Sequence, residues 1–278
     1  MPNTTSGTTI DDRPIGLFDS GIGGLTVLKT LLGDFPNESF LYLGDTARLP
    51  YGSKSAQTIE RYLIQNIDFL ASRNVKAVVV ACNSASTVLL GTTLTFPVPV
   101  YNVIEPGAER ALKATSGKRI GVLGTKATVA AKSYVNALHA RDASVEVFQQ
   151  ACPLLVPLVE EGMEEDPITN LIVYRYLTPL LEKGVDTLIL GCTHYPALRG
   201  AISRATSGRV ALIDSSEAIS ELIRADIASG RLGHSSQRSS FELMTTDVSE
   251  SFTQVARKLM LPHEIPDLVQ VDISIHAP

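Results

Sequence analysis

The sequence predicts an α/β protein of two similar lobes, each built on a doubly wound parallel sheet, with the active site in the cleft between them. Strand and helix patterns alternate along most of the 278 residues, as is typical of parallel sheets. The pattern restarts near residue 119, and the length suits two modest domains. Two apolar runs, VKAVVVACNSAS and VDTLILGCTHYP, carry Cys82 and Cys192 at matching places 110 positions apart.

The first half of the chain contains four predicted strands, over residues 14–18, 39–45, 76–81 and 97–103. A glycine-rich loop at 19–24 opens the helix LTVLKTLL. Residues 55–74 predict an amphipathic helix with Ser55 as its N-cap. Its apolar side chains fall on one face: Ile59, Leu63, Ile67 and Leu70. The largely apolar run at 76–81 predicts a strand covered on both faces.

The second half repeats this arrangement with predicted strands at 119–124, 145–149, 186–190 and 209–214. Predicted helices run from the end of the first of these strands to about Leu138, from near Pro153, and over 168–183. Such βα repeats favour parallel sheets with right-handed crossovers. After about Ser215 we expect a helix, a polar loop, a strand at 241–247 and a final helix.

The order of these elements predicts a discontinuous first lobe. We expect residues 14–104 and 215–278 to form the lobe that carries Cys82, and residues 105–214 to form the lobe that carries Cys192. Residues 1–13 are predicted to be a flexible tail.

Composition excludes several classes of protein. Apolar residues make up 44% and charged residues 19%, with a net charge of −5, which is a globular balance. Lysine and arginine form no cluster, so we expect neither nucleic acid nor membrane as a partner. The polar N-terminus lacks a secretory pattern, and no run reaches the length of a membrane span. Three cysteines without disulfide spacing predict a cytoplasmic protein with free thiols.

The loops at the carboxyl ends of the predicted strands are the expected ligand site. They are short and rich in Gly, Ser, Thr and Asn, at 19–21, 45–52, 82–84, 124–125 and 192–194. Helices that begin after such loops present free N–H groups, which suit a carboxylate or a phosphate. We therefore expect a small ligand that carries an anionic group.

Three familiar kinds of site do not match. DSGIGG departs from the dinucleotide fingerprint because Thr26 stands where a third glycine is required. GVLGTK lacks the spacing of a phosphate-binding loop. Cys192 and His194 could supply metal ligands, but the thiols and five histidines form no ligand-spaced cluster. We expect no metal and no cofactor.

The paired cysteines carry the chemical hypothesis. A lone cysteine at a strand end is usually a small buried hydrophobe, which is our interpretation of Cys152. Two at matching places, each followed by polar residues, favour a function. The C-x-x-C spacing of a redox pair is absent, and an enzyme with one nucleophile would leave the second thiol idle. Thiols on opposite faces of a carbon could remove and deliver a proton, because the reference pKa of cysteine is near 8.5.

Asp19 either caps its turn or assists this chemistry, and His194 is either structural or tunes the pKa of Cys192.

Six segments also resemble the glutamate racemase family, within the aspartate/glutamate racemase superfamily. In order, they are GLFDSGIGGLTVL, LYLGDTARLPYGSKS, VVVACNSAS, NVIEPGA, ACPLLVPLVEEG and LILGCTHYPAL. The resemblance runs from about Ile15 to Asp214 and is loose in the last 60 residues. It implies a cofactor-independent interconversion of L- and D-glutamate by two cysteines, which supplies D-glutamate for peptidoglycan. It also implies two α/β lobes and a homodimer.

Residue roles follow from the same resemblance. Cys82 would be the base for D-glutamate, assisted by Asp19, and Cys192 the base for L-glutamate, assisted by His194. Glu160 is a further catalytic candidate near Cys192, with Glu161 as the alternative match. The implied substrate contacts are Asp19, Ser20, Tyr51, Gly52, Asn83, Ser84, Thr193 and His194. Ser84 departs from the threonine common in the family but keeps the hydroxyl.

Three alternatives remain open at this point. Aspartate could be the substrate instead of glutamate. Some family members are reported to inhibit DNA gyrase, usually with an added N-terminal segment, but the segment before Ile15 is short and polar. The chain could also be an α/β module that binds a small anion and has inert cysteines.

Overall fold

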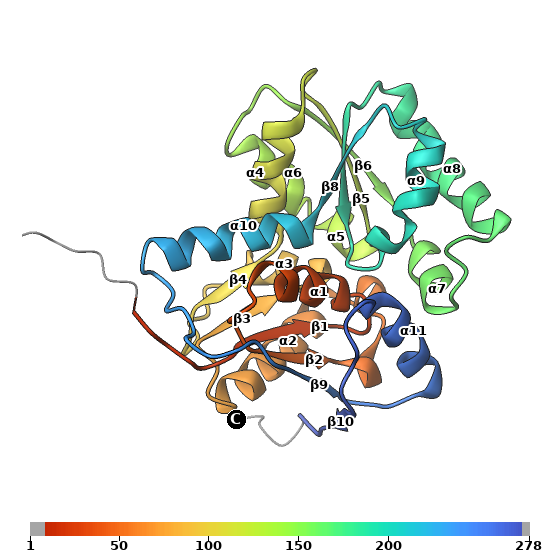
Figure 1. Ribbon diagram of the computed structural model, residues 1–278. Helices are drawn as coiled ribbons and strands as arrows, with labels where there is room; N and C mark the ends of the chain where they lie inside the picture. The colour runs from red at the N-terminus through yellow and green to blue at the C-terminus, as the bar shows by residue number, and fades with distance from the viewer. Residues whose placement is uncertain (1–8, 274–278) are drawn as a thin grey trace, which may run out of the picture.

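The computed structural model describes residues 9–273, apart from the Ser251 side chain, and its strands form two parallel sheets (Figure 1). The strands of the first sheet are β1 (Ile15–Asp19), β2 (Phe40–Gly44), β3 (Ala77–Val80), β4 (Val100–Asn102), β9 (Phe241–Thr245) and β10 (Leu268–Gln270). Those of the second sheet are β5 (Arg119–Gly124), β6 (Glu146–Ala151), β7 (Thr187–Gly191) and β8 (Ala211–Asp214). The sheet orders are β10-β9-β2-β1-β3-β4 and β6-β5-β7-β8.

The two sheets share a core order, which confirms the prediction of two similar lobes. In each, the second strand in sequence lies at one side of the first, and the third and fourth lie at the other. Cys82 follows β3 and Cys192 follows β7, the third strand of each set. The two cysteines therefore occupy equivalent positions beside the point where the strand order reverses, where ligands bind in open α/β sheets.

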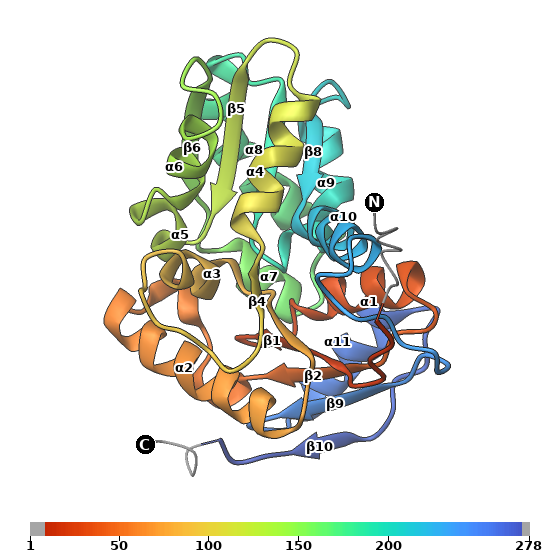
Figure 2. The same ribbon diagram turned by 90° about the vertical axis from the view of Figure 1, so that its left-hand side faces the viewer.

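Helices cover both faces of each sheet (Figures 1 and 2). On the first sheet, α1 (Leu25–Asp34), α10 (Ser215–Ala228) and α11 (Glu250–Met260) pack on one face, and α2 (Ala56–Ser72) and α3 (Asn83–Leu89) on the other. On the second, α7 (Leu155–Glu160), α8 (Pro167–Glu182) and α9 (Arg199–Ala205) oppose α4 (Ile104–Ala114) and α6 (Ser133–His139). Short elements complete the chain: α5 (Lys126–Ala130) and the 3₁₀ turns η1 (Thr46–Arg48), η2 (Tyr51–Ser53) and η3 (Tyr195–Leu198).

The doubly covered sheets explain the unbroken apolar runs in the sequence. Successive side chains of a strand point to opposite faces. In β3, Val79 faces the core under α1, whereas Val78 and Val80 face the core under α2, and all three are fully buried. An apolar residue is therefore needed at every position, as predicted.

Helix α2 confirms the predicted amphipathic pattern. The Ser55 side chain accepts a hydrogen bond from the Thr58 backbone N–H and so caps the helix. Ile59, Leu63 and Leu70 are buried against the sheet.

Two elements differ from the sequence-based expectation. The helix expected through Leu138 is divided into α5 and α6, because Lys132 takes a left-handed conformation with φ of 55° and interrupts the helical hydrogen bonds. Strand β10 was not predicted. It has three residues and lies at the sheet edge with its side chains largely exposed, so it carries no hydrophobic period.

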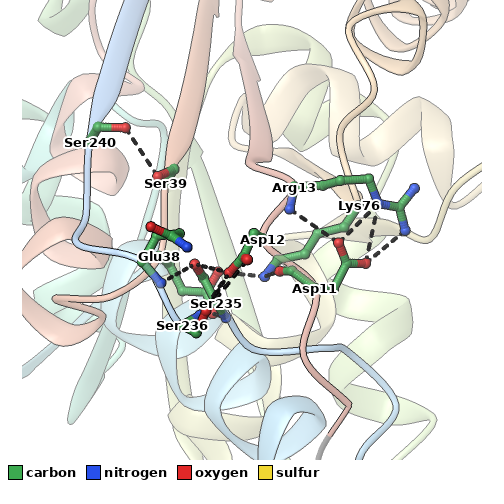
Figure 3. Close-up of polar contacts among 10 residues, drawn as sticks. Asp11, Asp12, Arg13, Glu38, Ser39, Lys76, Ser235, Ser236 and Ser240 are labelled. Atoms are coloured by element: carbon green, nitrogen blue, oxygen red, sulfur yellow. Dashed lines mark hydrogen bonds and ion pairs between the residues drawn. The ribbon is translucent and has the colours of Figure 1, made fainter.

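The N-terminal segment also differs from expectation. Residues 1–8 of the predicted flexible tail lie outside the described residues, but residues 9–13 are held in place. Asp11 N–H donates to the His234 carbonyl at 2.8 Å. The ammonium of Lys76 donates to the Asp11 carbonyl at 2.9 Å and forms a buried ion pair with Glu38 at 2.5 Å (Figure 3). This part of the expected tail is therefore fixed, because its backbone supplies an acceptor for a buried charge.

Chain connectivity supports the expected division into lobes, which we propose as residues 14–104 with 215–278, and residues 105–214; residues 274–278 lie outside the described residues. Helix α10 follows the last strand of the second sheet and packs on both α1 and α4 (Figure 1). Within residues 9–273, no helix is both long and apolar enough to cross a membrane.

Candidate active site

Both cysteine loops open onto one cavity of about 330 Å³ between the lobes. Residues from the first lobe that line it include Ser20, Tyr51, Gly52, Cys82, Asn83 and Ser84. Those from the second lobe include Thr125, Cys152, Val156, Glu160, Cys192, Thr193 and His194. The volume is at the small end of the roughly 300–1,000 Å³ typical of small-molecule sites. Every predicted site residue except Asp19 therefore lines the cavity, and Asp19 lies directly behind it.

The strand ends bring Asp19 and Cys82 together. Parallel pairing places Phe18 of β1 opposite Val80 of β3, so the residues that follow lie at the same sheet edge. The thiol of Cys82 donates to the Ser20 hydroxyl at 3.7 Å. The Asp19 carboxylate accepts from the Gly21 backbone N–H at 3.0 Å.

The first thiol is held in its protonated form. Burial raises the pKa of Cys82 to about 12, and the negative charge of Asp19 adds to this shift. Burial also raises the pKa of Asp19, although His194 and the hydrogen bonds to its carboxylate oppose the rise. At neutral pH, Cys82 is therefore a thiol, beside a carboxylate with increased affinity for a proton.

The second thiol, that of Cys192, lies beside a basic side chain instead of a carboxylate. His194 Nδ1 lies 3.8 Å from Cys192 Sγ, and Nε2 lies 3.1 Å from Glu160 Oε1. Burial alone would lower the pKa of His194, but its hydrogen bonds to Cys192 and Glu160 outweigh burial and raise the pKa to about 10. His194 is thus an imidazolium at neutral pH, with its Nδ1 against the sulfur of Cys192.

The geometry also distinguishes the two glutamates of the VEEG segment. Glu160 reaches His194 and lines the cavity, whereas Glu161 is exposed at the end of α7. Of these two glutamates, Glu160 is therefore the one that contacts His194 beside the second thiol.

The lobes meet closely around the cavity. Thr193 of the second lobe donates to Asp19 of the first at 3.1 Å. Ser84 and Thr125 share a hydrogen bond of 2.9 Å between the lobes. Gly23 is required here, because a Cβ at this position would lie 2.4 Å from His194 Nδ1. These contacts hold the two lobes together beside the cavity.

A buried network supports the loop that carries Tyr51 and Gly52. The Tyr51 hydroxyl donates to the fully buried carboxylate of Asp45. Arg48 pairs with the same carboxylate at 2.6 Å, and Asn66 donates to it at 3.3 Å. The network fixes the position of this side of the cavity.

Three residues around the cavity were not named as site residues from the sequence. Thr125 lies in the expected ligand loop at 124–125 and follows β5, the equivalent in the second lobe of β1, so matching the two lobes position by position would have given it a role in the site. Tyr134 of α6 donates to Asn83 Oδ1 at 2.7 Å, and no local pattern indicates this contact. Cys152 lies in the apolar wall, where burial raises its pKa, in keeping with its structural interpretation. Within the described range, no group of three His, Cys, Asp or Glu side chains is arranged to hold a metal.

Comparison with known proteins identifies the class. A model of the Asp/Glu/hydantoin racemase family matches residues 34–223. Two α/β lobes that place a thiol from each lobe on one cavity, together with this match, define an amino-acid racemase.

The similarity extends to particular members of the class. A glutamate racemase from Geobacter metallireducens is 41% identical over 264 residues, which cover 94% of this chain and 97% of that protein. The crystal structure of a Bacillus anthracis glutamate racemase has a TM-score of 0.87 at 36% identity and covers 94% of this chain and 97% of that one. A Francisella tularensis glutamate racemase, solved in complex with D-glutamate, has a TM-score of 0.86 at 34% identity, with 96% and 100% covered. The chain belongs to the glutamate racemase family.

Proposed function

We propose that this protein interconverts L- and D-glutamate by a two-base mechanism, with Cys82 and Cys192 on opposite faces of the substrate α-carbon. The observation that supports the proposal is the placement of both thiols on one enclosed cavity, each with a different proton partner. The reaction supplies D-glutamate for peptidoglycan.

In the direction from L- to D-glutamate, Cys192 acts as the base. Its thiolate removes the α-proton, and the imidazolium of His194 with Glu160 stabilises the charges around it. Cys82, a thiol at neutral pH, then donates its proton to the opposite face. The carbon inverts, and the enzyme is left with a thiol at Cys192 and a thiolate at Cys82.

In the reverse direction, Cys82 must act as the base. It is then a thiolate, as the forward direction leaves it, and the negative charge of Asp19 assists by raising the affinity of this thiolate for the α-proton. Cys192 then donates the proton to the other face. Each direction thus begins from the protonation state in which the other ends.

Binding must supply much of the catalytic effect, since the α-proton of an amino acid is only weakly acidic. Positioned acid–base groups typically contribute about 10² to 10⁴-fold. We assign the remainder to fixed hydrogen-bond donors around the substrate carboxylates and to exclusion of water by the closed lobes. The proposed contacts are Asp19, Ser20, Tyr51, Gly52, Asn83, Ser84, Thr193 and His194.

Isotope exchange in heavy water tests the mechanism. We expect deuterium at Cα from either enantiomer of glutamate without added cofactor, and loss of racemisation in both Cys82→Ala and Cys192→Ala. Cys152→Ala is the matched control, since it also removes a buried thiol from the cavity wall, and it should retain racemisation. Full activity in either single catalytic variant would exclude two bases. Faster turnover of aspartate than glutamate would reassign the substrate.

We also propose a cytoplasmic homodimer, on the strength of the family membership. Sedimentation equilibrium measures this assembly directly, and a monomer at micromolar concentration would contradict it.

A further inference from the structure

One buried amide in the cavity has an unused donor. Asn83, the first residue of α3, is 2% exposed and lines the cavity. Its Oδ1 accepts from the Tyr134 hydroxyl at 2.7 Å, whereas its Nδ2 has no hydrogen-bond partner in the described part of the chain. Buried amide N–H groups are usually paired, so this donor is available for a ligand.

The contact with Tyr134 fixes which end of the amide faces the cavity. A side-chain amide has an acceptor oxygen and a two-donor nitrogen, and a tyrosine hydroxyl either donates or accepts. Ser215 Oγ lies 3.4 Å from Tyr134 Oη on the other side. When Ser215 donates to Tyr134, the tyrosine proton is directed to Asn83 Oδ1, and Nδ2 is left toward the cavity.

Tyr134 is itself held rigidly. The side chain is fully buried, and its ring lies against α4 at Gly107 and the end of β7 at Gly191. Burial raises the pKa of the Tyr134 hydroxyl, so it keeps its proton near neutral pH. The hydroxyl is therefore a fixed donor.

We propose that Tyr134 is a positioning residue, which holds the Asn83 amide so that its Nδ2 donors face a substrate carboxylate. The inference deepens the proposed function and rests on it. Because Tyr134 belongs to the second lobe and Asn83 to the first, the amide is oriented only while the lobes are in contact. Substrate binding and the closed arrangement thereby favour each other.

Steady-state kinetics of Tyr134→Phe tests this role, since the ring and its packing remain and the hydroxyl is lost. We expect the KM for both glutamate enantiomers to rise about fivefold, the effect of one neutral hydrogen bond, with kcat changed much less. Tyr101→Phe is the matched control: it removes a tyrosine hydroxyl that donates to Asp226 outside the cavity, and KM should stay at the wild-type value.

A double-mutant cycle with Asn83→Ala shows whether Tyr134 acts through the Asn83 amide or only through its contribution to the structure of the protein. Asn83→Ala alone should lower kcat/KM by about 10- to 100-fold, because it removes donors to a charged group. The Tyr134→Phe change should then have no further effect, since it acts through Asn83. If it still raises KM about fivefold in the Asn83→Ala enzyme, or has no effect in the wild type, the positioning role is wrong.

Ser215→Ala provides a second test if Tyr134→Phe fails to fold. This substitution removes the donor that orients the Tyr134 proton. It should raise KM about two- to threefold in the wild-type enzyme and leave KM unchanged in the Asn83→Ala enzyme. An equal rise in both backgrounds, or none, would overturn the proposal. Racemisation by the wild-type protein is measured alongside, and its absence would contradict the proposed function. If the wild type is active but the effects of the substitutions at Asn83 and Tyr134 simply add, only the role of Tyr134 is contradicted.

Discussion

The two thiols of the cavity have ionisable neighbours of opposite charge. Burial, with the nearby buried carboxylate of Asp19, raises the pKa of Cys82 to about 12. Cys192 lies beside His194, whose pKa is raised to about 10. At neutral pH the two sides of the cavity therefore differ: Cys82 carries its proton, and a cation lies beside Cys192.

The raised pKa of His194 predicts a pH dependence of stability. The folded protein binds this proton more tightly than the unfolded chain, whose histidine has a pKa of 6.5. The stabilisation is therefore fully present below pH 6.5 and is lost as the pH rises toward 10. The titration of His194 should therefore lower the free energy of unfolding by up to about 1.4 kcal/mol for each pH unit within that window.

Urea unfolding between those pH values measures the slope. His194→Asn should lack this part of it. His139→Asn should keep it, because that ring contacts the Val145 carbonyl away from the cavity. An identical slope in wild type and His194→Asn would show that the proton is not held as described.

Sequence reasoning identified the two cysteines that line the cavity but not all of their partners. Cys82 and Cys192 are found because each follows an apolar strand, a pattern that lies within a dozen residues. The choice between Glu160 and Glu161 needed the turn at the end of α7, which directs only the first toward His194. The contacts that Thr125 and Tyr134 make were not predicted, because their partners belong to the other lobe.

At the scale of elements, a buried ion pair organises the base of the first lobe. Lys76, just before β3, and Glu38, just before β2, have side chains 1% and 3% exposed. The pair also binds backbone: Lys76 donates to the Asp11 carbonyl, and the Ser235 N–H donates to Glu38 at 2.8 Å (Figure 3). It thus joins the N-terminal segment and the returning loop after α10 to the sheet.

Removing one partner should destabilise the protein strongly. Lys76→Met leaves the Glu38 carboxylate buried and unpaired, at a cost of about 3–5 kcal/mol in the free energy of unfolding. Chemical denaturation measures it, and hydrogen exchange should show faster exchange at residues 231–240. The control is Lys113→Met, which removes an exposed pair with Glu109 on α4 and should leave the denaturation midpoint unchanged. Equal midpoints for both variants would contradict this role.

Helices and strands with a long, regular hydrophobic pattern were predicted more accurately than those with a short or irregular one. The central strands and α2 have long apolar periods and were predicted close to their observed bounds. The division at Lys132 was missed, because a left-handed lysine has no sequence signal like that of glycine. Strand β10 owes its conformation to pairing with β9, at Leu268 opposite Leu243, rather than to its three residues.

At the scale of the whole molecule, the site depends on how closely the lobes approach. The loop after β1 lies directly against the Thr193–His194 loop of the second lobe, and Gly23 leaves no space between them. A side chain at this position must push the lobes apart or displace His194.

Gly23→Ala should therefore impair catalysis while the protein remains folded. A displacement of about 1 Å at the reacting groups can lower the rate by about 100-fold, and we expect a loss of this order in kcat/KM for glutamate. Gly33→Ala in α1 is the matched control, since its Cβ meets nothing within 4 Å. It should retain activity and gain about 0.5–1 kcal/mol of stability. Wild-type kinetics in Gly23→Ala would show that the lobes tolerate a wider separation.

The sequence alone determined the βα alternation, the doubly covered sheets and the equivalent positions of the two cysteines. These follow from hydrophobic period and strand-end residues, which are local properties of the chain. The tertiary structure alone decided which groups meet across the cavity. Asp19 and Thr193 are 174 residues apart, and Asn83 and Tyr134 are 51 apart. Contacts at such separations depend on how two independently patterned lobes pack together, and no local period encodes that packing.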